Sequence, residues 1–175
     1  MNWPGIAAPQ RRLVMDPASE VISGHHVSCR CALCLEQLRA RVIAAATTWL
    51  GTPFVHGQSC KGAGVDCAWL LIEAFHAAGL IPRVDPGVYP RHWFLHRGDL
   101  RYVEWLRRFA DPVTDDPQPA DVALFRIGRA PAHAALVVAW PQIIHVLPES
   151  TVRYAQADNC ELSGRLHSVW RCRGL

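Results

Sequence analysis

The chain has 175 residues, of which 50% are hydrophobic and 19% are charged. That length and composition suit one domain with a closed hydrophobic core and exclude an intrinsically disordered chain. The formal net charge of +3, with no basic helix or tail, gives no reason to expect a nucleic-acid partner. No apolar run is long enough to span a membrane, and residues 1–10 do not form a secretory signal, so synthesis in a reducing cytoplasm is expected.

The first 28 residues are extended and rich in turns, and we expect at most one short strand there, near 13–15 or 21–22. Residues 35–50 then carry apolar side chains at every third or fourth position. This spacing predicts an amphipathic helix with Arg39 and Arg41 off its apolar face. The Gly-Thr-Pro sequence that follows ends the helix.

A Gly-rich loop over residues 55–66 leads into a second predicted helix at 67–78, and a third, shorter helix is expected at 100–109. After a polar, Pro-rich connection at 111–119, the hydrophobic period changes to that of strands. Five short strands are predicted, at 122–126, 134–140, 143–147, 151–154 and 168–172. Helices first and strands second indicate an α+β fold, with the helices packed on a small antiparallel β-sheet.

Cys67 lies where the Gly-rich loop meets the second helix, and the positive end of the helix dipole there favours thiolate over thiol. Backbone N–H groups at such a position can also hold a developing oxyanion. A thiolate needs a base, and His133 opens a predicted strand from which an imidazole can reach the helix start. His145 follows on the next strand, so a hairpin can set the two imidazoles side by side. The alternative is an inert buried thiol with two ordinary histidines.

Three runs carry a resemblance to a known family: WLGTPFVHGQSCKGAGVDCAWLL, AHAALVV and IIHV. They resemble the NlpC/P60 cysteine peptidases, and most of all the branch found in phage and prophage tail modules. The resemblance covers roughly residues 36–172, including YPRHWFLHR and the closing SVWR. It implies a papain-like NlpC/P60 peptidase domain at residues 35–175, preceded by an extended N-terminal arm at residues 1–34.

By that resemblance, Cys67 is the nucleophile, His133 is the base and His145 orients the base. The family usually cleaves peptidoglycan stem peptides, often between a D-γ-glutamyl residue and a diamino acid, and catalysis requires no cofactor. Asp66 matches a position that contacts the amino group of the substrate. The implied reaction is attack of the sulfur on an amide carbonyl, protonation of the leaving amine by the imidazolium, and hydrolysis of the thioester.

Two positions depart from the family pattern. Phe54 stands where relatives commonly carry a Tyr whose hydroxyl helps build the site, and a Phe cannot donate a hydrogen bond. His56, which we also expect to bind substrate, and Gln58 are candidates for the replacement donor, and the alternative is that both are plain loop residues. Ala68-Trp69 follow the nucleophile where relatives often have Ser-Gly, which is a milder change.

The seven cysteines are odd in number, so they cannot all pair within one chain. Cys29, Cys31 and Cys34 lie close together before the first helix. This spacing suits a zinc ion or an iron–sulfur cluster, although both usually take four ligands. Candidates for the fourth ligand are His25, His26, Cys60 and a residue of a neighbouring protein. The alternative is a set of reduced, partly buried thiols.

Two functions follow from these observations. The first is a phage tail-associated peptidoglycan endopeptidase, made in the host cytoplasm and carried in the virion tail, with stem peptides and tail hub or tail-tip proteins as partners. The second is a structural tail-tip or hub component that keeps the hydrolase fold as a scaffold, with a metal or iron–sulfur site in its arm. The Trp and Arg residues of 91–108 either contact glycan or a partner protein, or serve as core Trp and solvated Arg.

Overall fold

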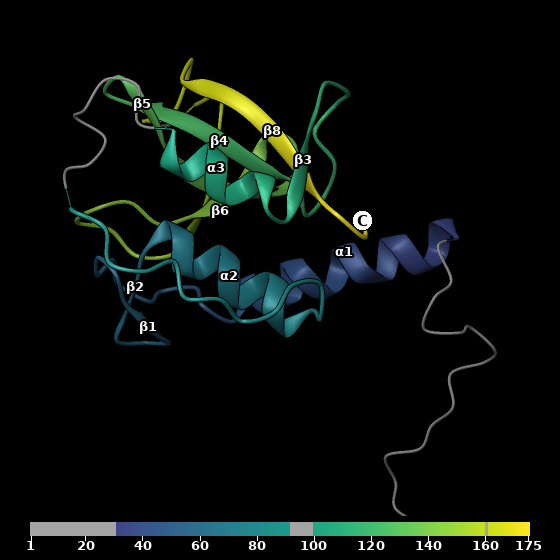
Figure 1. Cartoon of the computed structure of the whole chain (residues 1–175), viewed down its shortest axis with the longest axis horizontal. Helices are drawn as coiled ribbons and strands as arrows, with labels where there is room; N and C mark the ends of the chain where they lie inside the picture. Colours follow the sequence, from purple (N-terminus) through teal and green to yellow (C-terminus); the bar gives the residue numbers. More distant parts are fainter. Residues whose placement is uncertain (1–30, 92–99, 160) are drawn as a thin grey trace, which may run out of the picture. The chain divides into compact units, whose positions relative to one another are not determined.

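The structure is a computed structural model that describes residues 31–91, 100–159 and 161–175 (Figure 1). The strand expected near 13–15 or 21–22 therefore lies outside the described residues. Residues Cys31–Leu175 form one unit. Its helices are α1 (Ala32–Thr47), α2 (Cys67–Ala77) and α3 (Arg101–Arg107). Its strands are β1 (Ser59–Cys60), β2 (Gly64–Val65), β3 (Ala110–Val113), β4 (Val122–Ile127), β5 (Ala130–Ala139), β6 (Gln142–His145), β7 (Arg153–Gln156) and β8 (Leu166–Cys172).

Six of these strands form one antiparallel sheet in the order β3-β8-β4-β5-β6-β7, and β1 and β2 form a separate two-stranded pair. The β4–β5 and β5–β6 connections are hairpins, so the central strands are also neighbours in sequence. β8 lies between β3 and β4 although it follows all of them along the chain. The predicted α+β class, with helices and an antiparallel sheet, is confirmed.

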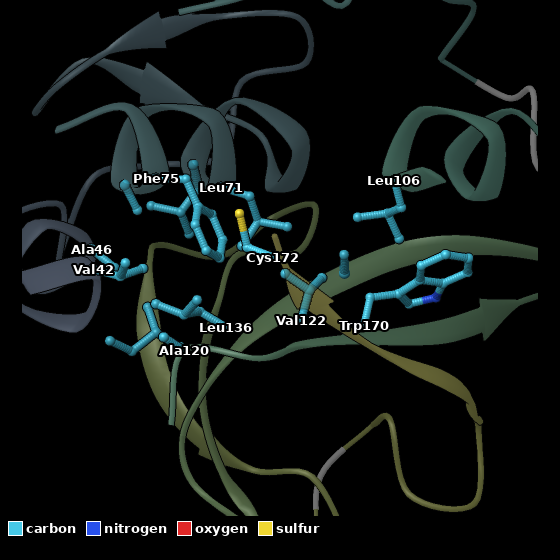
Figure 2. Packing of buried hydrophobic residues seen from close by; sticks show 14 of the residues in the cluster. Val42, Ala46, Leu71, Phe75, Leu106, Ala120, Val122, Leu136, Trp170 and Cys172 are labelled. Atoms are coloured by element: carbon cyan, nitrogen blue, oxygen red, sulfur yellow. The ribbon is translucent and has the colours of Figure 1, made fainter. Parts of the chain in front are cut away.

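Alternating side chains of the central strands enter two different hydrophobic clusters, one on each face of the sheet. On β4, Val122 and Leu124 join the larger cluster, whereas Ala123 and Phe125 join the smaller one. All three helices contribute to the larger cluster. Figure 2 shows the α2 side chains pointing toward the sheet within this cluster, where the Cys172 sulfur is also buried.

Helix α2 forms because its apolar residues recur on one face, and it buries that face against the sheet. Its buried side chains are Leu70, Leu71, Ile72, Ala74 and Phe75. The helix packs beside α1 and against β5 (Figure 1). This packing fixes the first turn of α2, and therefore Cys67, relative to the start of β5.

Two local features differ from the sequence prediction. The predicted loop contains the β1–β2 pair, whose tight packing requires Gly64, since a Cβ there would lie 2.6 Å from the Val55 side chain. The predicted polar connection begins with β3, which pairs with β8. Arg39, which the sequence predicts off the apolar face of α1, binds Asp121 at 3.4 Å and the Pro119 carbonyl through its guanidinium. None of the described helices has the length and apolar character needed to cross a membrane.

Candidate active site

A cavity of about 390 Å³ opens over the first turn of α2. Four residues that the sequence predicts for the site line it: His56, Asp66, Cys67 and His133. His145 is fully buried and reaches the cavity through His133, with which it forms a hydrogen bond. The cavity therefore combines the loop before α2, the start of α2 and the start of β5.

Cys67 is the first residue of α2, and Asp66 is the residue that caps the helix. The Tyr102 hydroxyl donates to the Cys67 sulfur at 4.0 Å, and the backbone at Ala134 also forms a hydrogen bond with this thiol. Burial, and then the neighbouring Asp66 carboxylate, raise the pKa of Cys67 to about 12. Burial thus favours the thiol in this state, and the role of Cys67 as a thiolate nucleophile stays a prediction.

The β5–β6 hairpin brings the two histidines together. His133 Nε2 lies 3.2 Å from His145 Nδ1, and the two rings meet edge to face. This hydrogen bond occupies Nε2 of His133 and leaves Nδ1 as the nitrogen that can exchange a proton with the cavity. Among the described residues, no hydrogen bond joins His133 to Cys67; the two side chains share the cavity wall.

Both imidazoles are neutral at neutral pH. Burial, followed by the charge of His145, lowers the pKa of His133 to about 3. Burial also lowers the pKa of His145 to about 4. Within the described part of the chain, His145 Nε2 has no hydrogen-bond partner. When His133 takes up a proton at Nδ1, its Nε2–H therefore donates to the lone pair of His145 Nδ1. His145 then carries its own proton on Nε2, the atom without a hydrogen-bond partner.

Asp66 ties three segments together. Its carboxylate accepts hydrogen bonds from the Trp69 N–H at 3.0 Å, from the Gly57 N–H at 2.8 Å and from the Tyr89 hydroxyl. The residue is only 3% exposed. It thus caps α2, closes the loop before it and holds Tyr89 at the cavity. The contact with a substrate amino group that the sequence assigns to Asp66 stays a prediction.

His56 lies beside the same carboxylate. Its Nδ1 is 3.8 Å from Asp66 Oδ2, and its Nε2 is 2.9 Å from the Tyr89 carbonyl oxygen. Phe54 also lines the cavity, whereas Gln58 is not among the described lining residues. Of the two candidates for a replacement donor, only His56 is therefore in place, and its substrate-binding role stays a prediction.

Two functional candidates escaped the sequence prediction, Tyr89 and Tyr102. Both hydroxyls point into the site, one to Asp66 and the other to the Cys67 sulfur. Tyr89 opens the YPRHWFLHR run of the resemblance, but nothing in that run marks the tyrosine as a site residue, and no spacing links either tyrosine to Cys67. From the Arg- and Trp-rich stretch, Arg91, Arg101 and Trp105 line the cavity, and residues 92–99 lie outside the described residues.

The cysteine cluster before α1 is described only in part, because Cys29 lies outside the described residues. The sulfur atoms of Cys31 and Cys34 are 3.4 Å apart at the start of α1. Across residues 31–91, 100–159 and 161–175, no three His, Cys, Asp or Glu side chains converge in a way that could hold a metal ion. The zinc or iron–sulfur site stays a prediction.

No protein-family model and no curated protein matches the sequence. Solved structures do match. An NlpC/P60 family protein from Bacillus cereus aligns over 77% of this chain with a TM-score of 0.56 and 18% identity. The chain spans only 40% of the length of that protein.

Two proteins of Mycobacterium tuberculosis are also similar. The peptidoglycan hydrolase RipB aligns over 81% of this chain and 67% of its own, with a TM-score of 0.52 and 17% identity. RipD, described as a non-catalytic NlpC/P60 domain protein adapted to peptidoglycan binding, aligns over 79% of this chain and 98% of its own, with a TM-score of 0.51 and 17% identity. At such identities the likeness establishes the fold, and the predicted NlpC/P60 fold is confirmed.

Proposed function

We propose that this chain is a cysteine peptidase that hydrolyses amide bonds in peptidoglycan stem peptides. Cys67 is the nucleophile, His133 is the general base and acid, and His145 orients His133. The observation that carries the proposal is one cavity that holds both a helix-start thiol and the outer member of a buried histidine pair. The fold shared with the hydrolase RipB supports the same substrate class.

The reaction starts from a neutral thiol and a neutral imidazole, since the pKa of Cys67 is about 12 and that of His133 is about 3. The Cys67 proton moves to His133 Nδ1 as the sulfur attacks the carbonyl carbon. The carbon–nitrogen bond then breaks, and the imidazolium protonates the leaving amine. Water next adds to the thioester, giving its proton to His133, and the product acid leaves as the thiol re-forms.

Within this reaction the His145 lone pair stabilises the transient imidazolium without a negative charge. A neutral partner compensates the buried positive charge less than a carboxylate would. The His133 proton is therefore held weakly and is passed readily to the leaving amine.

Digestion of purified stem peptides tests the proposal. We expect Cys67→Ala to lose at least ~10³-fold in rate, because no other group replaces the nucleophile. Cys60→Ala is the matched control, since Cys60 is an exposed cysteine on β1 and its removal should leave the rate unchanged. Equal product from the wild type and Cys67→Ala would contradict the proposal.

One observation favours a second candidate, a peptidoglycan-binding domain without catalysis. Cys67 and His133 are both neutral and form no hydrogen bond with each other among the described residues, and RipD shares the fold. Co-sedimentation with insoluble peptidoglycan separates the candidates. Binding by wild type and Cys67→Ala alike, with no released product from either, supports the second.

The setting of the reaction is a further part of the proposal. The sequence resemblance to phage tail modules supports an enzyme made in the host cytoplasm, carried in a virion tail beside hub or tail-tip proteins, and acting on the cell wall during genome delivery. Particles with Cys67→Ala should then assemble but fail to infect. Failure of assembly on deletion of residues 1–34 would support the alternative role as a structural tail-tip component.

A bound metal is a separate proposal for the cysteine cluster. Cys29, Cys31 and Cys34 would hold a zinc ion or an iron–sulfur cluster, and the closeness of the Cys31 and Cys34 sulfurs supports two of the ligands. Metal analysis and a visible spectrum of aerobic and anaerobic preparations test it. Less than about 0.3 equivalents of zinc or iron in both would count against a site that requires one ion per chain.

A further inference from the structure

Tyr102 contacts the reacting sulfur from an element that the sequence does not connect with catalysis. It lies on α3, and its hydroxyl is 4.0 Å from the Cys67 sulfur in the donor position. The residue is 7% exposed and lines the same cavity as Cys67 and His133. Its position is fixed because Val103 and Leu106, its neighbours on α3, are buried in the larger hydrophobic cluster.

The chemistry of a buried phenol restricts what Tyr102 can do. Burial, and then the charges of Cys67 and Asp66, raise the pKa of Tyr102 well above its ordinary value. The hydroxyl therefore keeps its proton and can donate to a neighbouring anion. Beside a buried sulfur, such a donor stabilises a charge more strongly than it would in solution.

Other side chains at the cavity do not supply this contact. The Tyr89 hydroxyl donates to Asp66, and Phe54, which also lines the cavity, has no hydroxyl. The backbone at Ala134 is the second group that hydrogen-bonds the thiol. Among the described residues, Tyr102 thus provides the side-chain hydroxyl that faces the sulfur.

We propose that Tyr102 is a catalytic residue whose hydroxyl donates a hydrogen bond to the Cys67 sulfur and stabilises the thiolate that attacks the substrate. The proposal rests on the proposed function in one respect, that Cys67 is the nucleophile. The thiolate exists only during attack, because burial disfavours it in the resting site. A donor already in place at the sulfur lowers the cost of forming it without reorganisation.

Alkylation of Cys67 by iodoacetamide tests the contact without any peptidoglycan. The thiolate displaces iodide, so the rate reports how readily the thiolate forms. Mass spectrometry of the peptide that contains Cys67 isolates this site from the other cysteines. We expect Tyr102→Phe to slow alkylation of Cys67 about three- to tenfold between pH 7 and 9. Loss of a charge-assisted hydrogen bond reduces the thiolate fraction, and the greater basicity of the remaining thiolate offsets only part of that loss.

Tyr154→Phe is the matched control. It also deletes one hydroxyl, but that hydroxyl lies at the surface, 3.3 Å from Thr47 Oγ1, and the alkylation rate should stay at the wild-type value. An unchanged rate in a folded Tyr102→Phe protein overturns the proposal. So does an equal slowing in Tyr154→Phe.

A second measurement covers the case in which Tyr102→Phe does not fold. The Tyr89→Phe/Tyr154→Phe protein carries Tyr102 as its sole tyrosine, so growth on 3-fluorotyrosine labels this position alone. The more acidic phenol is a stronger donor and should speed alkylation of Cys67 relative to the unlabelled protein. No acceleration overturns the proposal.

The two proposals fail separately. If Tyr102→Phe slows alkylation but Cys67→Ala still cleaves stem peptides, the assignment of the nucleophile fails and the contact with the sulfur stands. If Cys67→Ala is inactive and Tyr102→Phe alkylates normally, the peptidase stands and the role of Tyr102 is wrong.

Discussion

Two groups of polar residues, each built around a buried side chain, lie beside the central strands of the sheet, and their polar atoms are satisfied in different ways. The Asp121 cluster consists of Asp121, Arg39 and Arg171. Its carboxylate is fully buried and accepts bonds from the Arg171 guanidinium at 2.8 and 3.0 Å and from the Gln118 N–H at 2.9 Å. The histidine pair, His133 and His145, is equally buried but has one hydrogen bond between its members and no counter-charge in contact with it among the described residues.

The contrast separates a polar group that stabilises the fold from one to which the proposed function assigns a chemical role. A buried charge persists only when it is paired and hydrogen-bonded, and the Asp121 cluster meets this requirement. The histidine pair instead keeps ring nitrogens without hydrogen-bond partners. Such nitrogens lower the stability of the fold, so their retention points to a function that needs them. The two sites should therefore respond to substitution in opposite ways.

The largest expected effect is on the histidine pair and on activity alone. His133→Gln removes the base, and we expect stem-peptide hydrolysis to fall about 10³-fold, which corresponds to about 4 kcal/mol in the barrier. The free energy of unfolding should change by less than about 1 kcal/mol, because no ion pair is broken. Initial rates and urea unfolding measure the two quantities. A His133→Gln protein that is less stable but still active would contradict this prediction.

Asp121→Asn should show the opposite behaviour. Loss of the charge leaves Arg39 and Arg171 facing a neutral amide, and we expect a loss of about 3 kcal/mol in the free energy of unfolding. Activity per folded molecule should be unchanged. Asp115→Asn is the matched control, since it removes a bond to the same Arg171 from a carboxylate that is 58% exposed, and it should be nearly neutral. Equal destabilisation in both variants would show that burial is not the cause.

The free energy of unfolding should fall at acidic pH, and part of this fall should come from the histidine pair. The pKa values of about 3 for His133 and about 4 for His145 lie below the ordinary value of 6.5. Below pH 6.5 the unfolded chain therefore binds protons that the folded chain does not, and stability falls as the pH falls. We expect His145→Gln to reduce this loss by about 2 kcal/mol between pH 6.5 and 5. Parallel plots of the free energy of unfolding against pH for wild type and His145→Gln in that interval would contradict the attribution to the histidine pair.

The smallest expected effect concerns the link between Tyr89 and Asp66. Tyr89→Phe removes one of three donors to a buried carboxylate, and we expect a loss of about 1 kcal/mol in the free energy of unfolding. The Michaelis constant should change more than the turnover number, because Tyr89 shapes the cavity wall and does not contact the sulfur. A fall in turnover number alone would instead place this hydroxyl in the chemical step.

Much of the sheet and the principal helix could be predicted from local patterns. The helix expected at 67–78 is observed at Cys67–Ala77, because its apolar spacing coincides with the face that it buries. The hairpin that brings His133 to His145 also followed from a short connection between two apolar strands. Such features depend on neighbours in sequence, which a pattern can report.

The remainder depends on contacts between distant segments. Tyr102 and Cys67 meet only because α3 and α2 pack on the same sheet, and nothing in either local sequence encodes that contact. Nor could the partner of Arg39 be predicted, because Asp121 lies just before β4, 82 residues further along the chain. The pKa of Cys67 could not be predicted either, because it depends on burial rather than on position at a helix start.

The place of β8 in the sheet has a consequence for the order of events during synthesis. β8 is made after every other strand, yet it separates β3 from β4, and β3 pairs with β8 alone among the described strands. A nascent chain that still lacks β8 already contains Cys67 and both histidines. It has no strand with which β3 can pair, and therefore no fixed position for the adjoining α3. The contact between Tyr102 and the Cys67 sulfur should therefore form late in folding, after β8 has paired with β3 and β4.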